Sequence, residues 1–109
     1  MNAAYQSCID MCRRCADACE TCLAACLKEK NVNVMARCIS LDLECITACY
    51  TAAKLMTLDS DHANAMCQLC ADICTACAEE CEKHKMDHCR QCAVVCRDCA
   101  EECMSMAAA

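Results

Sequence analysis

The sequence contains no glycine, proline, phenylalanine or tryptophan, and its two tyrosines are the only aromatic residues. The absence of glycine excludes glycine-dependent phosphate loops, tight β-hairpin turns and knuckle-type zinc sites, because these need backbone conformations that other residues avoid. The absence of proline removes the strongest helix breaker. The two absences together favour long helices joined by short polar turns.

Long apolar runs and a basic leader are also missing. No segment reaches the roughly 18 consecutive apolar residues of a transmembrane helix, so we expect no membrane span. The N-terminal residues contain no basic stretch followed by an apolar one, and we therefore expect a mature cytosolic protein in a reducing compartment. The net charge of −6 and the scarcity of aromatic residues argue against nucleic-acid binding.

Large apolar side chains are scarce. Leucine, isoleucine and valine together are fewer than the 19 cysteines, which with a net charge of −6 would ordinarily indicate disorder. An unpaired thiol, however, behaves as a small buried hydrophobe, and alanine adds apolar surface with strong helix propensity. We therefore predict one small domain, residues 1–109, whose modest core would gain much stability from a bound ligand.

The cysteines follow a helical period. Most are separated alternately by three and four residues, which averages close to the 3.6 residues of an α-helical turn. Each series is therefore a row along one helix face, where leucine and isoleucine normally sit in a bundle. A core of thiols indicates a protein that holds something that binds sulfur. The three dense series are Cys8, Cys12, Cys15, Cys19, Cys22 and Cys26; Cys67, Cys70, Cys74, Cys77 and Cys81; and Cys89, Cys92, Cys96, Cys99 and Cys103.

Four amphipathic segments are expected, over residues 3–29, 34–56, from the turn at 59–61 to about 84, and from 87 to about 106. Short connections between long helices imply antiparallel neighbours. We predict an all-α fold, an antiparallel up-down-up-down four-helix bundle with a cysteine-lined core. The expected N-caps are Asn33 for the second helix, Asp59, Ser60 or Asp61 for the third, and Asp87 for the fourth.

The second helix departs from the pattern. It carries only Cys38, Cys45 and Cys49, and Leu41 and Asp42 occupy the step where a fourth thiol is expected. Asp42 would either hydrogen-bond a thiol or point outward where the helix rotates. We favour a structural role for this carboxyl over metal ligation.

Structural cysteines and disulfides explain the rows poorly. One or two buried cysteines are usually structural, but nineteen in phase are not. Neighbours in one row lie about 5–6 Å apart at Cβ, whereas a disulfide needs about 3.5–4.5 Å. Cross-helix pairs meet that limit, yet 19 is an odd number and a cytosolic setting disfavours disulfides.

Zinc and iron–sulfur sites fit the CxxC motifs but not their setting. The motifs lie inside continuous helical patterns, and a ferredoxin run would also expect a following proline. A Zn²⁺ ion with four thiolates carries a net charge of about −2, and the backbone N–H groups of a helical core are already committed to helix hydrogen bonds. Buried charge without partners is costly. The motifs are Cys67–Cys70, Cys74–Cys77, Cys89–Cys92 and Cys96–Cys99.

Cu(I) fits better, because this soft monovalent ion favours thiolate and thioether ligands. One Cu(I) per thiolate gives no net charge, so a core can fill without accumulating charge. With metal–sulfur bonds of about 2.3 Å, a two-coordinate ion spans about 4.6 Å between sulfurs. Small side-chain adjustments bring thiols of one row, or of facing helices, to that distance.

The cysteine spacing, the sparse segment 38–49 and the turn pattern of His84, His88, Cys89 and Cys92 resemble the bacterial cytosolic copper storage proteins. The resemblance covers nearly the whole chain. It implies a four-helix bundle that binds many Cu(I) ions along its interior, assembles as a homotetramer and stores copper without being an enzyme. Exported relatives carry a signal sequence, so the resemblance also agrees with a cytosolic location.

The remaining soft ligands lie near the ends of the expected helices. The resemblance and the position suggest that His84 and His88 hold copper at one mouth of the bundle, with the thioether of Met86 between them, although solvated histidines are equally compatible with a polar turn. His62 is expected on the surface at the opposite end, and Tyr5 is expected to plug one end of the core. Four methionines are expected as core gap-fillers rather than ligands: Met35, Met56, Met66 and Met106.

These observations predict intracellular Cu(I) storage or sequestration by all 19 cysteines, with His84 and His88 as further candidate ligands. The alternatives are a general thiolate buffer for zinc and copper, a metal-responsive regulator, or a copper chaperone. A regulator needs a basic or aromatic surface that the sequence does not show, and a chaperone needs only one exposed site. Capacity along four helices favours storage.

Overall fold

The structure is a computed structural model that describes residues 3–109, and in that range it contains helices and no strand. The long helices are α1 (Gln6–Cys26), α2 (Ala36–Thr57), α3 (Ala63–Cys81) and α4 (Asp87–Ala108). Short 3₁₀ segments precede the first two, η1 (Ala3–Tyr5) and η2 (Val32–Met35). The predicted all-α fold is confirmed. No helix within residues 3–109 is long and apolar enough to cross a membrane.

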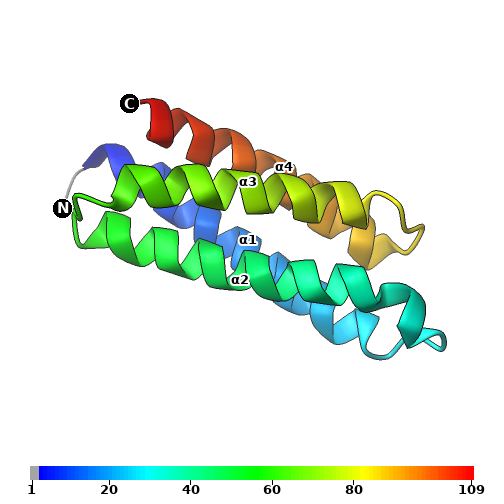
Figure 1. Ribbon diagram of the computed structural model, residues 1–109. Helices are drawn as coiled ribbons and strands as arrows, with labels where there is room; N and C mark the ends of the chain where they lie inside the picture. The colour runs from blue at the N-terminus through cyan, green and yellow to red at the C-terminus, as the bar shows by residue number, and fades with distance from the viewer. Residues whose placement is uncertain (1–2) are drawn as a thin grey trace.

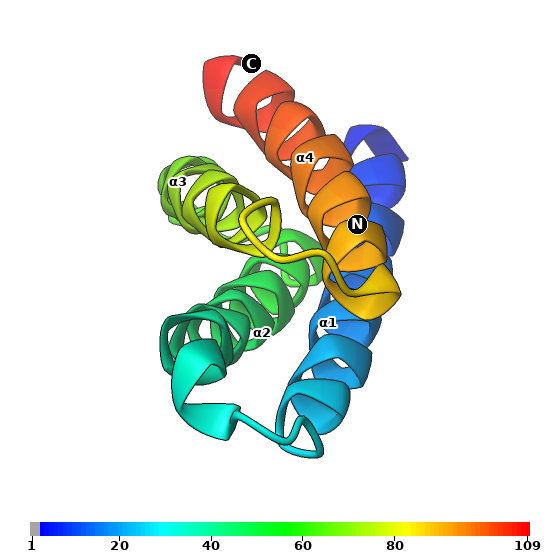
Figure 2. The same cartoon turned by 90° about the vertical axis from the view of Figure 1, so that its right-hand side faces the viewer.

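The four helices form an elongated antiparallel bundle of 45 × 18 × 17 Å. Each helix packs against the next along the chain, and α4 returns to pack against α1 (Figure 1). Viewed toward one end, the four helices surround a common axis (Figure 2). The up-down-up-down topology is therefore the predicted one, and it leaves one inner face of every helix directed at the same narrow core.

The core consists mainly of cysteine and alanine. Every cysteine is at most 1% exposed, and the rows therefore point inward as expected. Within residues 3–109 few large apolar side chains join them: Ile9, Met35 and Met56 are at most 1% exposed, Leu41 4% and Met11 8%. Because small side chains line all four helices, the helices approach one another closely and the thiols of facing rows come into contact.

Most of the predicted N-caps are wrong in position. Ser60 is the exception: its side-chain oxygen accepts from the His62 N–H and its carbonyl from the Ala63 N–H, both at 3.0 Å, just before α3. In α2, α3 and α4 the cap positions are Met35, His62 and Met86, and none of these makes a side-chain capping hydrogen bond. Asn33 lies inside η2 instead. Asp87 is the first residue of α4, where its charge still suits the positive end of the helix dipole.

The turn between α2 and α3 explains why its acidic residues do not cap α3. Asp59 has a φ of 53°, the left-handed conformation that ends many helices. Its N–H bonds to the Met56 carbonyl, and the N–H of Ser60 bonds to the Leu55 carbonyl, both at 3.0 Å. This paired arrangement closes the C-terminus of α2. Asp59 therefore terminates one helix rather than starting the next.

Two helices end earlier than expected. Residues 27–29 and 82–84 continue as turns, in which Glu29 donates to the Cys26 carbonyl and His84 donates to the Cys81 carbonyl. Such i→i−3 bonds tighten a last turn without extending the α-helix. The helical sequence pattern extends through both turns, which is why it overestimated the two lengths.

Candidate metal centre

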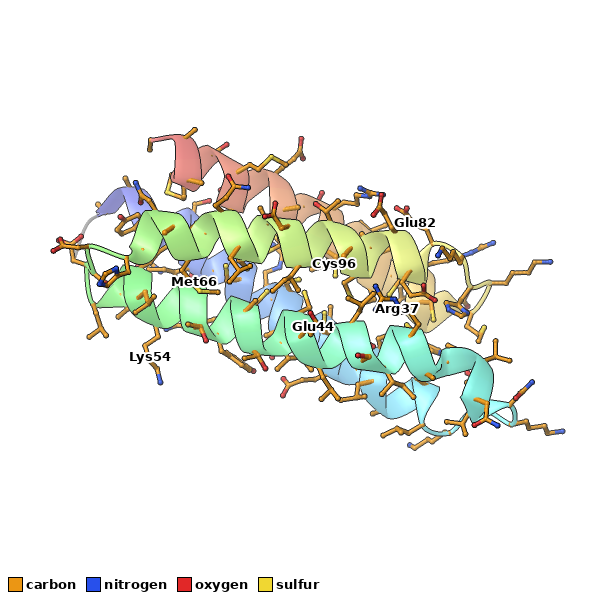
Figure 3. The ribbon with its side chains drawn as sticks, in the orientation of Figure 1. Arg37, Glu44, Lys54, Met66, Glu82 and Cys96 are labelled. Atoms are coloured by element: carbon orange, nitrogen blue, oxygen red, sulfur yellow. The ribbon has the colours of Figure 1, made fainter. Side chains whose placement is uncertain are left out.

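All 19 cysteines lie within the described residues, and all are free thiols. The dense rows come from α1, α3 and α4, and α2 contributes the sparse one. In Figure 3 the side chain of Cys96 lies between the ribbons, whereas Lys54 projects outward from α2. The helices thus place their sulfur atoms along the bundle axis and their charges on the outside.

Most of the thiols contact one another through their sulfur atoms, both across helices and along one row. Across helices, Cys12 and Cys103 have their Sγ atoms 3.6 Å apart, as do Cys45 and Cys74. Along one row the separations are slightly longer, for example 3.9 Å between Cys22 and Cys26. These distances are weak S–H···S contacts and are far longer than the roughly 2.05 Å of a disulfide. The predicted disulfide-free state is what the structure shows.

Several sets of four sulfur atoms lie within 4.8 Å of one another. A metal ion placed at the centre of such a set would contact all four with little movement of the side chains. The sets include Cys12, Cys49, Cys70 and Cys99; Cys15, Cys49, Cys74 and Cys99; Cys15, Cys19, Cys45 and Cys96; Cys19, Cys77, Cys92 and Cys96; and Cys22, Cys26, Cys38 and Cys89. The first four of these sets share members with their neighbours in the order given, whereas the fifth, near the α3–α4 turn, shares none with them.

Asp42 points into the core and is fully buried. Its Oδ1 atom accepts hydrogen bonds from the thiols of Cys77 at 3.3 Å and Cys92 at 3.7 Å. Its Oδ2 atom is buried without a partner among residues 3–109. Of the two expected orientations, the inward one that contacts thiols is therefore correct.

Burial, with smaller contributions from the neighbouring Cys92 and Cys38, raises the pKa of the Asp42 carboxyl to about 8. The carboxyl is thus mostly protonated at neutral pH. A neutral acid is compatible with a core that has no cation near it. It also means that the apo-core carries little buried charge.

Burial also controls the thiols at the end of the bundle near the α3–α4 turn. Loss of solvent raises the pKa of Cys89 to about 12, and it raises the pKa of Cys26 as well. Both thiols are therefore protonated at neutral pH. A metal ion that binds there must displace protons.

His88 joins this end of the thiol array. Its Nδ1 atom lies 3.4 Å from Cys22 Sγ and 3.6 Å from Cys89 Sγ, and its Nε2 atom lies 3.0 Å from a carboxylate oxygen of Glu29. The sequence identified His88 by its place at the turn. The sequence did not indicate that Glu29 would contact His88, because the two residues are 59 positions apart along the chain.

His84 is held differently. Its Nε2 atom bonds to Glu80 at 3.0 Å, and Lys83 contacts the same carboxylate at 3.4 Å. Glu80 is nearly buried, and its spacing of four residues from His84 is the signal by which the sequence could have revealed the pair. The structure therefore brings His88, but not His84, to hydrogen-bond distance from thiols within the described residues.

The opposite end of the bundle is closed by polar contacts. The Tyr5 hydroxyl donates to the side chain of Asn64 at 3.0 Å, and Asn64 in turn donates to the Ala109 carbonyl at 3.2 Å. Tyr5 packs against the core cluster, consistent with the expected plug, and His62 is exposed as expected. Met35 and Met56 are buried, and Met66 and Met106 are half-buried against the core.

Comparisons with known proteins agree with this arrangement. The family model described as "Copper storage protein" matches residues 1–108. The cysteine-rich protein YhjQ of Bacillus subtilis (strain 168) is 48% identical over 103 residues, which cover 94% of this chain and 95% of that protein.

Solved structures extend the likeness to three dimensions. The Cu(I)-bound copper storage protein BsCsp3 has a TM-score of 0.92 and 46% identity, covering 95% of this chain and 98% of that one. A cytosolic copper storage protein from Streptomyces lividans, with five coppers, has a TM-score of 0.93 and 37% identity, covering 97% and 93%. These similarities span almost the full length of the chain and include its thiol-bearing helices.

Proposed function

This chain belongs to the copper storage protein family, and on that basis we propose that it stores Cu(I) in the cytosol, bound by cysteine thiolates inside the bundle. The observation that carries the proposal is the array of 19 free, buried thiols along the bundle axis. A chaperone that passes on a single ion needs one accessible site. Rows along four helices supply capacity, and we infer that the chain 1–109 acts as one storage unit rather than as an enzyme.

The charge balance of the core supports a monovalent ion. Each Cu(I) that replaces one thiol proton leaves the core charge unchanged, so filling can continue from one end of the array to the other. The inward-facing Asp42 is mostly protonated at neutral pH and adds little charge. We therefore propose about one copper per thiolate, with the cysteines on all four helices as ligands.

The sulfur spacing also supports this cargo. Facing thiols lie 3.6–3.8 Å apart in pairs such as Cys12 and Cys103 or Cys49 and Cys70. Trigonal coordination with bonds of about 2.3 Å needs sulfurs about 4.0 Å apart, and linear coordination needs about 4.6 Å. The side chains must therefore move outward by only a fraction of an ångström to about 1 Å on loading. A helical scaffold accommodates such shifts by small changes in χ1.

Protons leave as copper arrives. Near His88, the thiols of Cys26 and Cys89 are protonated at neutral pH because burial raises their pKa. Each bound ion should release about one proton. Loading is then favoured by higher pH and by the affinity of soft metal for sulfur, and bound copper stabilises the folded state because the unfolded chain has no preformed site.

His88 is proposed as the copper ligand at the mouth, because its Nδ1 atom faces the Cys22 and Cys89 thiols. His84 remains a candidate that would first have to leave Glu80.

We also propose assembly as a homotetramer. A surface groove between α2 and α3 is lined by apolar side chains, among which Leu43 and Leu69 are about half exposed. Burying such side chains against another copy would remove apolar area from water. Light scattering coupled to size exclusion measures the assembly mass, and a monomer at all concentrations would contradict this part of the proposal.

Anaerobic titration of the reduced protein with Cu(I), in the presence of a chromogenic Cu(I) chelator, tests the storage function. We expect the chelator to remain colourless until about 19 equivalents are bound. Saturation after one to four equivalents would refute storage and favour a chaperone. A competing titration with Zn²⁺, followed by thiol accessibility, distinguishes Cu(I) storage from a general thiolate buffer.

A further inference from the structure

We propose that the end of the bundle beside the α3–α4 turn holds a single divalent soft metal ion, of the Zn²⁺ class, bound by Cys22, Cys26, Cys89 and His88. The proposal rests on the proposed storage function in one respect, since copper entering at this end would have to displace that ion. It concerns one position of the array only, and the interior thiols are not part of it.

The distances at this end match a tetrahedral site with three sulfurs and one nitrogen. With Zn–S bonds of about 2.3 Å and Zn–N bonds of about 2.05 Å, tetrahedral geometry puts S···S at about 3.8 Å and S···N at about 3.5 Å. His88 Nδ1 lies 3.4 Å from Cys22 Sγ and 3.6 Å from Cys89 Sγ. Cys22 and Cys26 have their Sγ atoms 3.9 Å apart, and the sulfurs of Cys22, Cys26, Cys38 and Cys89 all lie within 4.8 Å of one another. Cys38, 3.8 Å from Cys26, is the alternative fourth ligand to His88.

The histidine is already oriented for a metal. Glu29 accepts a hydrogen bond from Nε2 of His88 at 3.0 Å, which leaves the Nδ1 lone pair directed at the thiols. A carboxylate behind the histidine is the usual support of a zinc-bound imidazole, because it fixes the tautomer and raises the basicity of the ligating nitrogen. Glu29 is here a positioning residue and does not touch the metal.

Charge distinguishes this end from the interior. An interior set of four thiolates with a divalent ion has a net charge of about −2 in a core whose backbone donors are committed. Three thiolates and a neutral imidazole reduce that charge to about −1. The His88 and Glu29 side chains are 17% and 33% exposed, so solvent also reaches this site. The divalent ion is therefore restricted to one end, whereas Cu(I) fills the remainder.

The exchange chemistry is simple. A divalent ion that binds here replaces the three thiol protons of Cys22, Cys26 and Cys89, which leave to solvent, and no group is oxidised or reduced. When Cu(I) arrives, Cu(I) ions and, where fewer than three bind, protons from solvent take the three thiolates, and the divalent ion departs to solvent. The copper-free protein thus holds a divalent ion at this end until Cu(I) is available.

The test is an anaerobic titration of the full reduced chain with Co²⁺, followed by displacement with Zn²⁺. Tetrahedral thiolate-bound Co²⁺ absorbs in the visible, which reports both the geometry and the stoichiometry. We expect one equivalent with a tetrahedral spectrum, lost on addition of one equivalent of Zn²⁺. Absence of a tetrahedral spectrum, or several equivalents of equal affinity, would overturn the proposal.

Variants locate the ion. His88→Ala should lower the Zn²⁺ affinity at least 100-fold and change the Co²⁺ spectrum, whereas His62→Ala at the opposite end should leave both unchanged. Glu29→Ala should cost about 10–100-fold. Glu29→Gln should cost less, because its amide oxygen can still accept from Nε2. Equal effects of the two Glu29 variants, or no effect of His88→Ala, would contradict the assignment.

Copper titrations separate this proposal from the storage function. In Glu29→Ala, which leaves every proposed ligand in place, the Cu(I) capacity should remain within about two ions of the parent protein. If the parent protein takes up many Cu(I) ions but no Co²⁺ or Zn²⁺, only the divalent site fails. If it takes up fewer than five Cu(I) ions while one Co²⁺ binds as predicted, the storage function fails and the divalent site stands.

Discussion

Replacing Asp42 with asparagine should make the apo-protein more stable at neutral pH. The carboxyl has a pKa of 3.8 when unperturbed and about 8 in the folded protein, because it is buried. In the unfolded chain at pH 7 the carboxyl is ionised, and folding requires it to take up a proton. Because pH 7 lies about three units above the unfolded pKa, and each unit is worth about 1.4 kcal/mol, this protonation costs about 4 kcal/mol. Asparagine is nearly isosteric, carries no charge, and retains the oxygen that accepts from Cys77.

The asparagine amide introduces two donors with only sulfur acceptors nearby, and this offsets part of the gain by about 1–3 kcal/mol. A net stabilisation of about 2 kcal/mol remains, equivalent to a rise in Tm of the order of 10 °C for a chain of this length. The size of this stability difference between Asp42→Asn and the parent depends on pH. Below pH 3.8 the Asp42 carboxyl is protonated in both the folded and the unfolded chain, so its raised pKa costs no stability. Between pH 3.8 and 8 the folded protein loses stability progressively, because only the unfolded chain releases the proton. The advantage of Asp42→Asn should therefore grow between pH 4 and 8 and then level off.

The assay is reversible urea unfolding of the reduced, metal-free protein at pH 4 to 9, followed by circular dichroism. Glu44→Gln is the matched control, since it removes a carboxylate from the exposed face of the same helix and should change the unfolding free energy by less than about 0.5 kcal/mol. A difference between Asp42→Asn and the parent that is constant across this range would refute the reasoning. So would a variant that is less stable than the parent at pH 8.

Three further outcomes are expected. Loading of Cu(I) in weakly buffered solution should release about one proton per ion, measured with a pH indicator, and release of fewer than one proton per two ions would contradict protonated thiols. Copper should raise the Tm, since one site at a free concentration of 100 times its Kd contributes about 2.7 kcal/mol, and calorimetry that shows no rise would contradict binding to the folded state. Cys45→Ala removes a thiol that contacts Cys15, Cys49 and Cys74, so the Cu(I) capacity should fall by about one or two ions, whereas the exposed Thr47→Ala should leave it unchanged.

The rows of thiols were predictable because their period alone places them on one face of each helix. Cys96 and Cys45 needed no knowledge of neighbouring helices to be assigned to the core. The orientation of Asp42 was less certain from sequence, because it depends on the rotation of α2 in the bundle. Only the assembled helices show that its carboxyl meets Cys77 and Cys92.

Helix ends and contacts between distant residues were the parts that sequence did not specify. Asp59 has the composition of an N-cap, yet its backbone adopts the left-handed turn that closes α2. Glu29 lies in a turn and meets His88 only because α1 and α4 are neighbours. Such pairs are set by tertiary geometry, for which a single sequence carries no local signal.

The sharing of thiols between neighbouring four-sulfur sets arranges four candidate metal sites in a single line along the bundle axis. Cys49 and Cys99 belong to two successive sets, and Cys19 and Cys96 belong to the next two. A metal ion within these four sets would change site by exchanging one or two sulfurs at a time, whereas the set Cys22, Cys26, Cys38 and Cys89 at the end near the α3–α4 turn shares no sulfur with them. Because Tyr5 and Asn64 close one end of the bundle, we expect metal ions to enter and leave at the other end, so that the last ion bound is the first released.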